Sequence, residues 1–234
     1  MSRARDGSAW RIGTDAEVAW IVTGTSAGLT ITAAIPPVFE AYATVELPFA
    51  GRGQDDHDRT MLALLSEQSA GQPWWLGYLD TGADDIVFPD APKVTLYWGW
   101  DYVLVEAGPE QAATWRRSGD WSFWKGALPN LMFPADRSWL VSTLWDDDWT
   151  CIGGPAGLVD SFLRHPDLPA RPVALGQDAT PPGHQATRRC DGWPRIAPRT
   201  GRTHARQQTI WVRQATFEGG QVVVLGDASH ARAR

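Results

Sequence analysis

The chain has 234 residues, 43% of them hydrophobic and 21% charged, proportions close to the globular average, so it can bury a substantial core. No apolar run approaches the roughly 18 residues of a membrane-spanning helix, which argues against a membrane protein. The 14 tryptophans exceed what a core of this size needs, so we expect some of them to line a surface.

Charge is unevenly distributed along the chain. Residues 1–180 carry 12 basic and 24 acidic side chains, whereas residues 181–234 carry 9 basic and 3 acidic ones, so the net charge of −6 divides into −12 and +6. An acidic body repels phosphate backbones, which disfavours nucleic acid as a ligand. The same charge attracts basic proteins, so a cationic protein partner is the first expectation.

Cysteine usage and the N-terminus suggest an ordinary soluble protein. Cys151 and Cys190 lie far apart and form no Cys-x-x-Cys pair, so neither a zinc site nor a disulfide framework is indicated. The N-terminal residues lead into no apolar segment of the secretory kind. We therefore expect a cytoplasmic protein with no membrane association, no metal and no cofactor.

The hydrophobic pattern predicts strands and short helices without regular alternation between them. Strands are predicted at 16–23, 28–33, 74–79, 93–98 and 102–106, with two more on either side of the acidic segment 146–148. Proline and capping signals predict helices at 38–42, after Asp58, at 109–115 and from Pro155. Residues 116–137 have the composition of a long loop.

This order of elements predicts an α+β fold. A single domain is expected over residues 10–177, with a mostly antiparallel or mixed sheet and short helices. From residue 178 the composition shifts to Arg, Gln, Thr, Gly and Pro, which predicts a basic tail of low order over 178–234. A terminal hairpin could form within 209–225, although an isolated hairpin is marginal in water.

The strongest candidate for a binding surface lies between Ser138 and Gly154. This segment begins as an alternating strand, breaks into three carboxylates between two tryptophans, and restarts as a strand that ends in Gly-Gly. The carboxylates lack the spacing of a calcium loop, so a solvated acidic turn or a partner-binding rim is favoured over a metal site. With the predicted hairpin loop 99–101, the segment defines a binding set of Trp100, Asp101, Trp145, Asp146, Asp147, Asp148 and Trp149.

The same residues support an alternative, a small-molecule or carbohydrate-binding protein that could also be hydrolytic. Indole faces stack on sugar rings, and two carboxyl groups at a suitable separation can hydrolyse a glycosidic bond. Paired core strands with aromatic cross-strand contacts account more simply for any single tryptophan. The tryptophans in question are Trp74, Trp75, Trp98, Trp100, Trp145 and Trp149.

One histidine lies among clustered carboxylates, in the segment Asp55–Asp58. A helix-capping loop explains this cluster, because a metal or acid–base site would need a second histidine nearby. The sequence contains no nucleophile-elbow, Cys–His or His-Glu-x-x-His motif. These observations leave open whether the protein is an enzyme and favour a non-enzymatic role.

Three segments, 35–43, 128–139 and 153–160, carry a resemblance. They contain Pro-Pro-x-Phe-x-Ala-Tyr, Pro-Asn-Leu-x-x-Pro-x-Asp-Arg-x-Trp and Gly-Gly-x-x-x-Leu-x-Asp. In these motifs the chain resembles a family of uncharacterised actinobacterial proteins, which usually have serine where Pro155 stands. The resemblance implies one domain that ends near residue 175 and an actinobacterial origin, and it implies no chemistry.

The turn at residues 36–42 is also similar to the start of a class of toxin-immunity proteins. Together with the acidic charge, this similarity suggests an immunity-type role against a basic toxin. The sequence therefore predicts a non-enzymatic interaction module that binds a protein partner through an acidic, tryptophan-bearing face.

Overall fold

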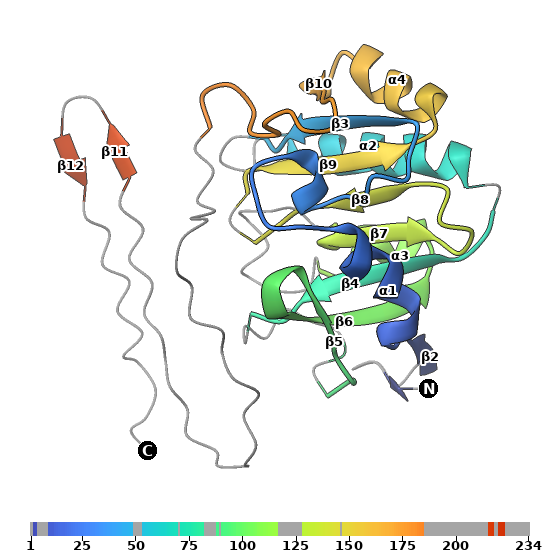
Figure 1. Cartoon of the computed structure of the whole chain (residues 1–234). Coiled ribbons are helices and arrows are strands. Elements are labelled where there is room, and N and C mark those ends of the chain that lie inside the picture. Colours follow the sequence, from blue (N-terminus) through green and yellow to red (C-terminus); the bar gives the residue numbers. More distant parts are fainter. Residues whose placement is uncertain are drawn as a thin grey trace. The chain divides into compact units, whose positions relative to one another are not determined.

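The computed structural model describes residues 2–3, 9–48, 53–69, 71–81, 88, 90–116, 128–145, 147–184, 215–217 and 220–222. The chain divides into two compact units, Met1–Pro194 and Arg195–Arg234. In the first unit, ten strands form one sheet in which each pairing is antiparallel, with short helices beside it (Figure 1). The predicted α+β class with a mostly antiparallel sheet is confirmed. No helix within the described ranges is long and apolar enough to cross a membrane.

The sheet has the strand order β1-β2-β6-β4-β7-β8-β9-β3-β10, and β5 pairs with the outer side of β6 next to β2. Every residue of the inner strands β4 and β9 is buried, because the sheet is covered on both faces. The strands are β1 (Ser2–Arg3), β2 (Ala9–Ile12), β3 (Ala41–Glu46), β4 (Trp74–Leu79), β5 (Val94–Leu96), β6 (Trp100–Ala107), β7 (Leu131–Pro134), β8 (Leu140–Ser142), β9 (Trp149–Gly154) and β10 (Ala170–Pro172).

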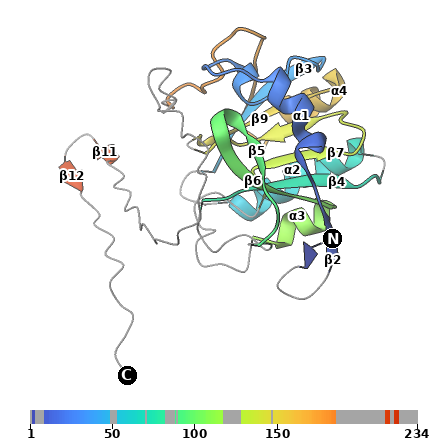
Figure 2. The same cartoon turned by 60° about the horizontal axis from the view of Figure 1, so that its bottom comes forward.

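Helices cover the two faces of the sheet and divide the core in two. Met61 and Leu65 of α2 and Phe162 of α4 pack in one hydrophobic cluster, and Val18 and Ile21 of α1 pack in the other. Figure 1 shows α1 in front of the strands and α2 behind them, and Figure 2 shows the strands between α1 and α3. The helices are α1 (Asp15–Gly24), α2 (Gln54–Gln68), α3 (Pro109–Thr114) and α4 (Ala156–Arg164), with 3-10 turns η1 (Ile31–Ala33) and η3 (Tyr97–Gly99).

The strand predicted at 16–23 is wrong, because these residues form helix α1. A capping box starts the helix: the Glu17 carboxylate accepts hydrogen bonds from the backbone nitrogen of Thr14 at 2.8 Å and from its hydroxyl at 2.6 Å. Val18 and Ile21, three residues apart, are the buried positions. The strand predicted at 28–33 is also wrong, since residues 31–33 form η1.

The helix predicted at 38–42 is wrong as well. Residues 36–40 form an irregular turn in which the Tyr42 hydroxyl accepts a hydrogen bond from the Phe39 backbone nitrogen at 2.9 Å. The chain then enters β3, which pairs along its whole length with β9. Pairing with a distant strand thus overrides the local helix-start signal of the two prolines.

Most of the remaining elements occur where they were expected. β4 occupies residues 74–79, and α2, α3 and α4 lie at the three predicted helix positions, although α2 begins earlier, at Gln54. β5 and β6 form the expected hairpin, but the predicted loop 99–101 is wrong: the turn is at residues 97–99, because Trp100 and Asp101 pair with Leu96 and Thr95. The predicted loop 116–137 also contains β7.

The first unit continues past residue 177, because Asp178 bridges to Thr30 and Ala179 is fully buried. In the second unit β11 (Ala215–Phe217) pairs antiparallel with β12 (Gly220–Val222), within the range 209–225.

Candidate functional site

Four residues of the predicted binding set lie at or near the surface of the first unit. Trp100 begins β6 and Trp145 lies in the connection between β8 and β9; both are half-buried, and their ring centroids are 6.2 Å apart with an interplanar angle of 32°. Asp101 is exposed and accepts a hydrogen bond from the Thr95 hydroxyl at 3.2 Å. Asp148 is also exposed. The tryptophan contact therefore joins the start of β6 to the connection between β8 and β9.

The other members of the set lie elsewhere. Asp147 and Trp149 are each only 1% exposed, and Trp149 packs in the core cluster on the α1 side of the sheet. Asp146 lies outside the described residues. Because a surface contact needs accessible side chains, a binding role remains a prediction for Trp100, Asp101, Trp145 and Asp148.

Sequence reasoning left Trp98 out of the binding set, yet its side chain is 52% exposed, more than that of any other tryptophan in the described part of the chain. It lies in η3, between β5 and β6, with φ 62° and ψ 18°. Bulky side chains rarely adopt this left-handed conformation, which costs about 1–2 kcal/mol. No signal in the sequence identified it, because residues 93–98 were predicted as a strand and the structure places Trp98 in the turn that follows β5. We call Trp98, Trp100, Asp101, Trp145 and Asp148 the tryptophan edge.

Tyr97 holds the turn that presents Trp98. Its side chain is 5% exposed, and its hydroxyl donates a hydrogen bond to the backbone oxygen of Ala34 at 2.9 Å and accepts one from the Ser142 hydroxyl at 3.0 Å. Burial raises the pKa of Tyr97 above its ordinary value, which keeps the hydroxyl neutral and able to donate. Since Tyr97 is fixed inward and has φ 37° itself, the chain turns sharply and the next indole faces solvent.

Three tryptophans of the proposed sugar platform are core residues. Trp74 and Trp75 of β4 are 1% and 5% exposed, and Trp149 is buried as described above. Trp74 packs edge-on against the buried Trp139 with ring centroids 4.9 Å apart. For these three residues, paired core strands are the correct explanation.

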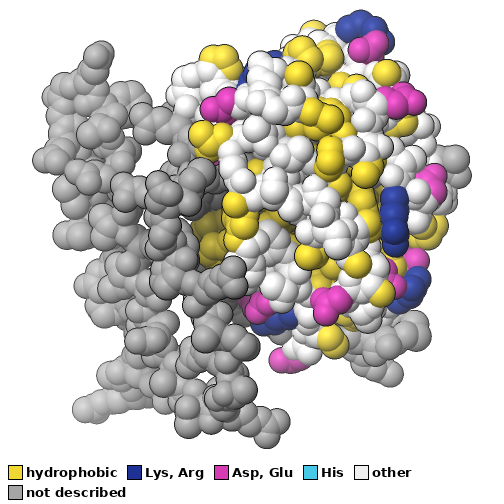
Figure 3. Space-filling model, in the orientation of Figure 1, with side chains coloured by type: hydrophobic (Ala, Val, Ile, Leu, Met, Phe, Trp, Pro, Cys, Tyr) yellow, Lys and Arg dark blue, Asp and Glu magenta, His cyan; other side chains and the backbone are white. Residues whose placement is uncertain are grey.

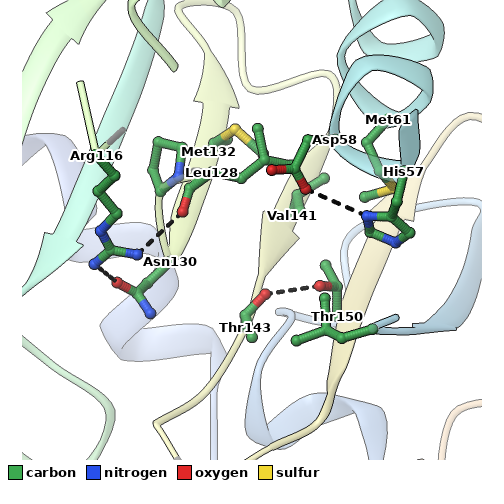
Figure 4. Close-up of a pocket in the computed structure, with 12 residues that line it drawn as sticks. His57, Asp58, Met61, Arg116, Leu128, Asn130, Met132, Val141, Thr143 and Thr150 are labelled. Atoms are coloured by element: carbon green, nitrogen blue, oxygen red, sulfur yellow. Dashed lines mark hydrogen bonds and ion pairs between the residues drawn. The ribbon is translucent and has the colours of Figure 1, made fainter. Parts of the chain in front are cut away.

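A buried polar cavity lies between α2 and the strands β7, β8 and β9 (Figure 4). Its volume is about 20 Å³, enough for about one water molecule and far too small for a sugar or nucleotide. Figure 4 shows His57 and Asp58 on one side and Arg116 and Asn130 on the other, with Thr143 and Thr150 between them. The cavity residues are Leu47, His57, Asp58, Met61, Arg116, Leu128, Pro129, Asn130, Met132, Val141, Thr143 and Thr150.

Hydrogen bonds hold most of these polar groups in place. The Arg116 guanidinium donates to the Asn130 side-chain oxygen at 2.6 Å and to the Leu128 backbone oxygen at 3.0 Å. The hydroxyls of Thr143 and Thr150 are 2.7 Å apart. Such a network fixes the ends of α3 and of the strands against one another.

The cluster around His57 lies in the first turns of α2 rather than in a loop before the helix. Asp58 accepts a hydrogen bond from the Gln54 side-chain nitrogen at 2.7 Å, and His57 Nδ1 lies 3.4 Å from the same oxygen. His57 Nε2 is buried and has no hydrogen-bond partner among the described residues. Within the same residues, no group of three or more His, Cys, Asp and Glu side chains could hold a metal ion.

An open groove of about 520 Å³ lies on the other side of His57. This volume falls in the range of ligand-binding clefts, and the groove contains more carboxylates than guanidinium groups. We call it the acidic groove, and it is lined by Glu46, Pro48, Gly53, Asp56, His57, Arg59, Thr60, Asp167 and Pro169.

Exposed apolar side chains also occur away from these sites. Val22, Val38 and Leu175 are 48%, 67% and 50% exposed. The face in Figure 3 has hydrophobic side chains across its middle and charged ones nearer its margin. These residues provide matched controls, because none of them belongs to the tryptophan edge or the acidic groove.

Comparison of the chain with protein-family models, with curated proteins and with solved structures finds no match in any of the three. The resemblance to an actinobacterial family therefore stays a prediction, and the function has to be argued from the geometry above.

Proposed function

We propose that the protein is a non-enzymatic interaction module that binds a cationic protein partner through the tryptophan edge. The observation that carries this proposal is the strained and exposed Trp98 beside the Trp100–Trp145 contact. Strained backbone persists where the surrounding structure fixes it, and it is concentrated at functional positions. Tryptophan is also enriched among the residues that dominate binding energy at protein interfaces.

Charge supports a basic partner. Asp101 and Asp148 are exposed, and residues 1–180 carry a net charge of −12. An acidic surface raises the association rate of a cationic protein and disfavours acidic competitors. An immunity protein that neutralises a basic toxin is the form of this function that we favour, since it needs tight binding and no catalysis.

Affinity capture tests the proposal. Tagged full-length protein is incubated with native lysate at about 50 mM salt, where electrostatic attraction is weakly screened. We expect a stoichiometric basic protein to be retained and to be released at high salt. Trp98→Ala should weaken retention at least about 30-fold, which corresponds to about 2 kcal/mol for an interface anchor.

Val38→Ala is the control. Val38 is apolar, is 67% exposed against 52% for Trp98, and lies outside the tryptophan edge. It should retain the partner as the unmodified protein does. If Trp98→Ala retains the partner equally well, or if no stoichiometric basic protein is captured at low salt, the proposal fails.

A second candidate is a carbohydrate- or small-molecule-binding protein, favoured by one observation. Trp100 and Trp145 are half-buried with their rings 6.2 Å apart, so a sugar ring could stack on the accessible part of an indole. Intrinsic fluorescence titrated with a sugar and nucleotide library would show a saturable change that Trp145→Ala removes. A flat response across the library would exclude this candidate.

A further inference from the structure

The walls of the buried cavity come from helix α2 on one side and from the strand pair β8–β9 on the other. Val141 of β8 pairs with Ile152 of β9, and both belong to the hydrophobic cluster that packs under α2. Side chains two residues apart along a strand share a face, so Thr143 and Thr150 point toward α2 as well. Figure 4 shows these two threonines and the His57 ring around the same space.

The hydrogen bonds of Asp58 decide which nitrogen of His57 carries the ring proton. Asp58 Oδ1 accepts a hydrogen bond from the Gln54 side-chain nitrogen at 2.7 Å, so this oxygen is an acceptor. His57 Nδ1 lies 3.4 Å from the same oxygen and is therefore the donor of that contact. In a neutral imidazole with its proton on Nδ1, the other nitrogen, Nε2, has only a lone pair and acts as an acceptor.

The Nε2 atom of His57 needs a hydrogen-bond donor that the described residues do not supply. The His57 side chain is 3% exposed, and Nε2 is buried without a hydrogen-bond partner among those residues. An unpaired buried acceptor costs about 1–3 kcal/mol, and buried polar groups nearly always have a partner. Because His57 lines the cavity, we look for the donor inside it.

The threonine pair on the opposite wall has one hydroxyl hydrogen to spare. Two hydroxyls carry two hydrogens, and the 2.7 Å contact between Thr143 and Thr150 uses one of them. A small molecule that both donates and accepts can therefore pair with His57 Nε2 on one side and with a threonine hydroxyl on the other. The cavity volume of about 20 Å³ admits one water molecule and nothing larger.

We propose that this cavity binds one water molecule, which donates a hydrogen bond to His57 Nε2 and accepts one from the Thr143–Thr150 hydroxyl pair. Two such bonds lie within the range typical of buried waters. Thr143 directly follows β8 and Thr150 lies in β9, so the water joins α2 to both ends of the connection between these strands. Trp145 and Asp148 of the tryptophan edge lie in that connection, and the water braces its base whatever the edge binds.

Oxygen-17 magnetic relaxation dispersion tests the site in full-length protein, because it counts water molecules that are held longer than the protein takes to tumble. The double variant Thr143→Val/Thr150→Val keeps the shape of both side chains and removes both hydroxyls. It should lose about one long-lived water molecule relative to the unmodified protein, since His57 Nε2 alone offers fewer than the usual two to four partners.

Thr30→Val/Thr32→Val is the matched control. The hydroxyls of Thr30 and Thr32 are also 2.7 Å apart and partly buried, but neither residue lines the cavity. This variant should retain the number of long-lived waters found in the unmodified protein. An unchanged count in the cavity variant, or an equal loss in both variants, would overturn the inference.

Two NMR measurements on the unmodified protein keep the test decisive if the cavity variant does not fold. Correlations between the ring protons and nitrogens of His57 should show the proton on Nδ1 and a bare Nε2. Cross-relaxation with a long-lived water should appear at the His57 proton on Cε1, which lies between the two nitrogens, and at the Thr150 methyl group. A ring proton on Nε2, or no water signal at these two positions, would refute the proposed water site.

Discussion

The strain at Trp98 can be measured by comparing Trp98→Ala with Trp98→Gly. The indole is 52% exposed, and both substitutions remove the same partly buried contacts. The two variants differ by one Cβ atom at a residue with φ 62° and ψ 18°. A Cβ in this conformation costs about 1–2 kcal/mol, and the freedom of glycine in the unfolded chain offsets about 0.4–1 kcal/mol of that. The glycine variant should therefore be more stable by about 0.5–1 kcal/mol.

Urea unfolding followed by far-UV circular dichroism gives this difference directly. With a slope of about 2 kcal/mol per molar urea, the midpoint of Trp98→Gly should lie roughly 0.3–0.5 M above that of Trp98→Ala. In ordinary helix or strand positions the order is reversed, because glycine destabilises relative to alanine.

Val38 supplies the matched control, since it is 67% exposed and is not among the residues with positive φ in the described ranges. Val38→Gly should be less stable than Val38→Ala. If Trp98→Ala is as stable as Trp98→Gly or more so, the turn is not strained and the argument that links strain to binding is wrong. Both Trp98 variants should lose the partner to the same extent, because both lack the indole.

Three further predictions concern the fold. Thr14→Ala should cost about 1 kcal/mol in thermal or urea unfolding, because it removes the hydroxyl that hydrogen-bonds Glu17 and lowers the pKa of that carboxyl. Gly153→Ala should lower the free energy of unfolding by about 1–3 kcal/mol, because the new Cβ would lie 2.5 Å from a side-chain carbon of Ile35. Gly157→Ala in α4 is the control and should stabilise slightly, because its Cβ would have no neighbour within 4 Å. Equal unfolding midpoints for the two variants would contradict the packing argument. Desolvation raises the pKa of all four tyrosines, so the folded protein keeps their hydroxyl protons at a pH where the unfolded chain loses them. The free energy of unfolding therefore has its full value below the tyrosine pKa of the unfolded chain, about 10, and falls as the pH rises above it. Tyrosinate absorbance near 295 nm should therefore appear together with alkaline unfolding, and a separate titration near pH 10 in folded protein would be inconsistent with this burial.

Local signals in the sequence were sufficient for much of the fold. The alternating residues within 93–106 predicted the β5–β6 hairpin, although they placed its turn at 99–101 instead of 97–99. Gly108-Pro109 and Pro155 marked the starts of α3 and α4. The Thr14-x-x-Glu17 capping box was also present and would have identified α1, but the β-branched and apolar residues after it have the composition of a strand.

The candidate site depended on contacts between distant parts of the chain. Alternation tells which side chains face the core only when one face of a sheet is exposed, and here helices cover both faces. The sequence could therefore place Trp149 at the acidic turn but could not show that it is buried.

The sequence by itself determined the α+β class, the acidic body and the region where tryptophans meet carboxylates. Only the tertiary structure decided which of those tryptophans faces solvent. Tyr97 is fixed by hydrogen bonds to Ala34 and Ser142, which lie 63 and 45 residues away along the chain. Because those anchors exist only once the sheet has assembled, the outward position of Trp98 is a property of the folded molecule, which local sequence cannot encode.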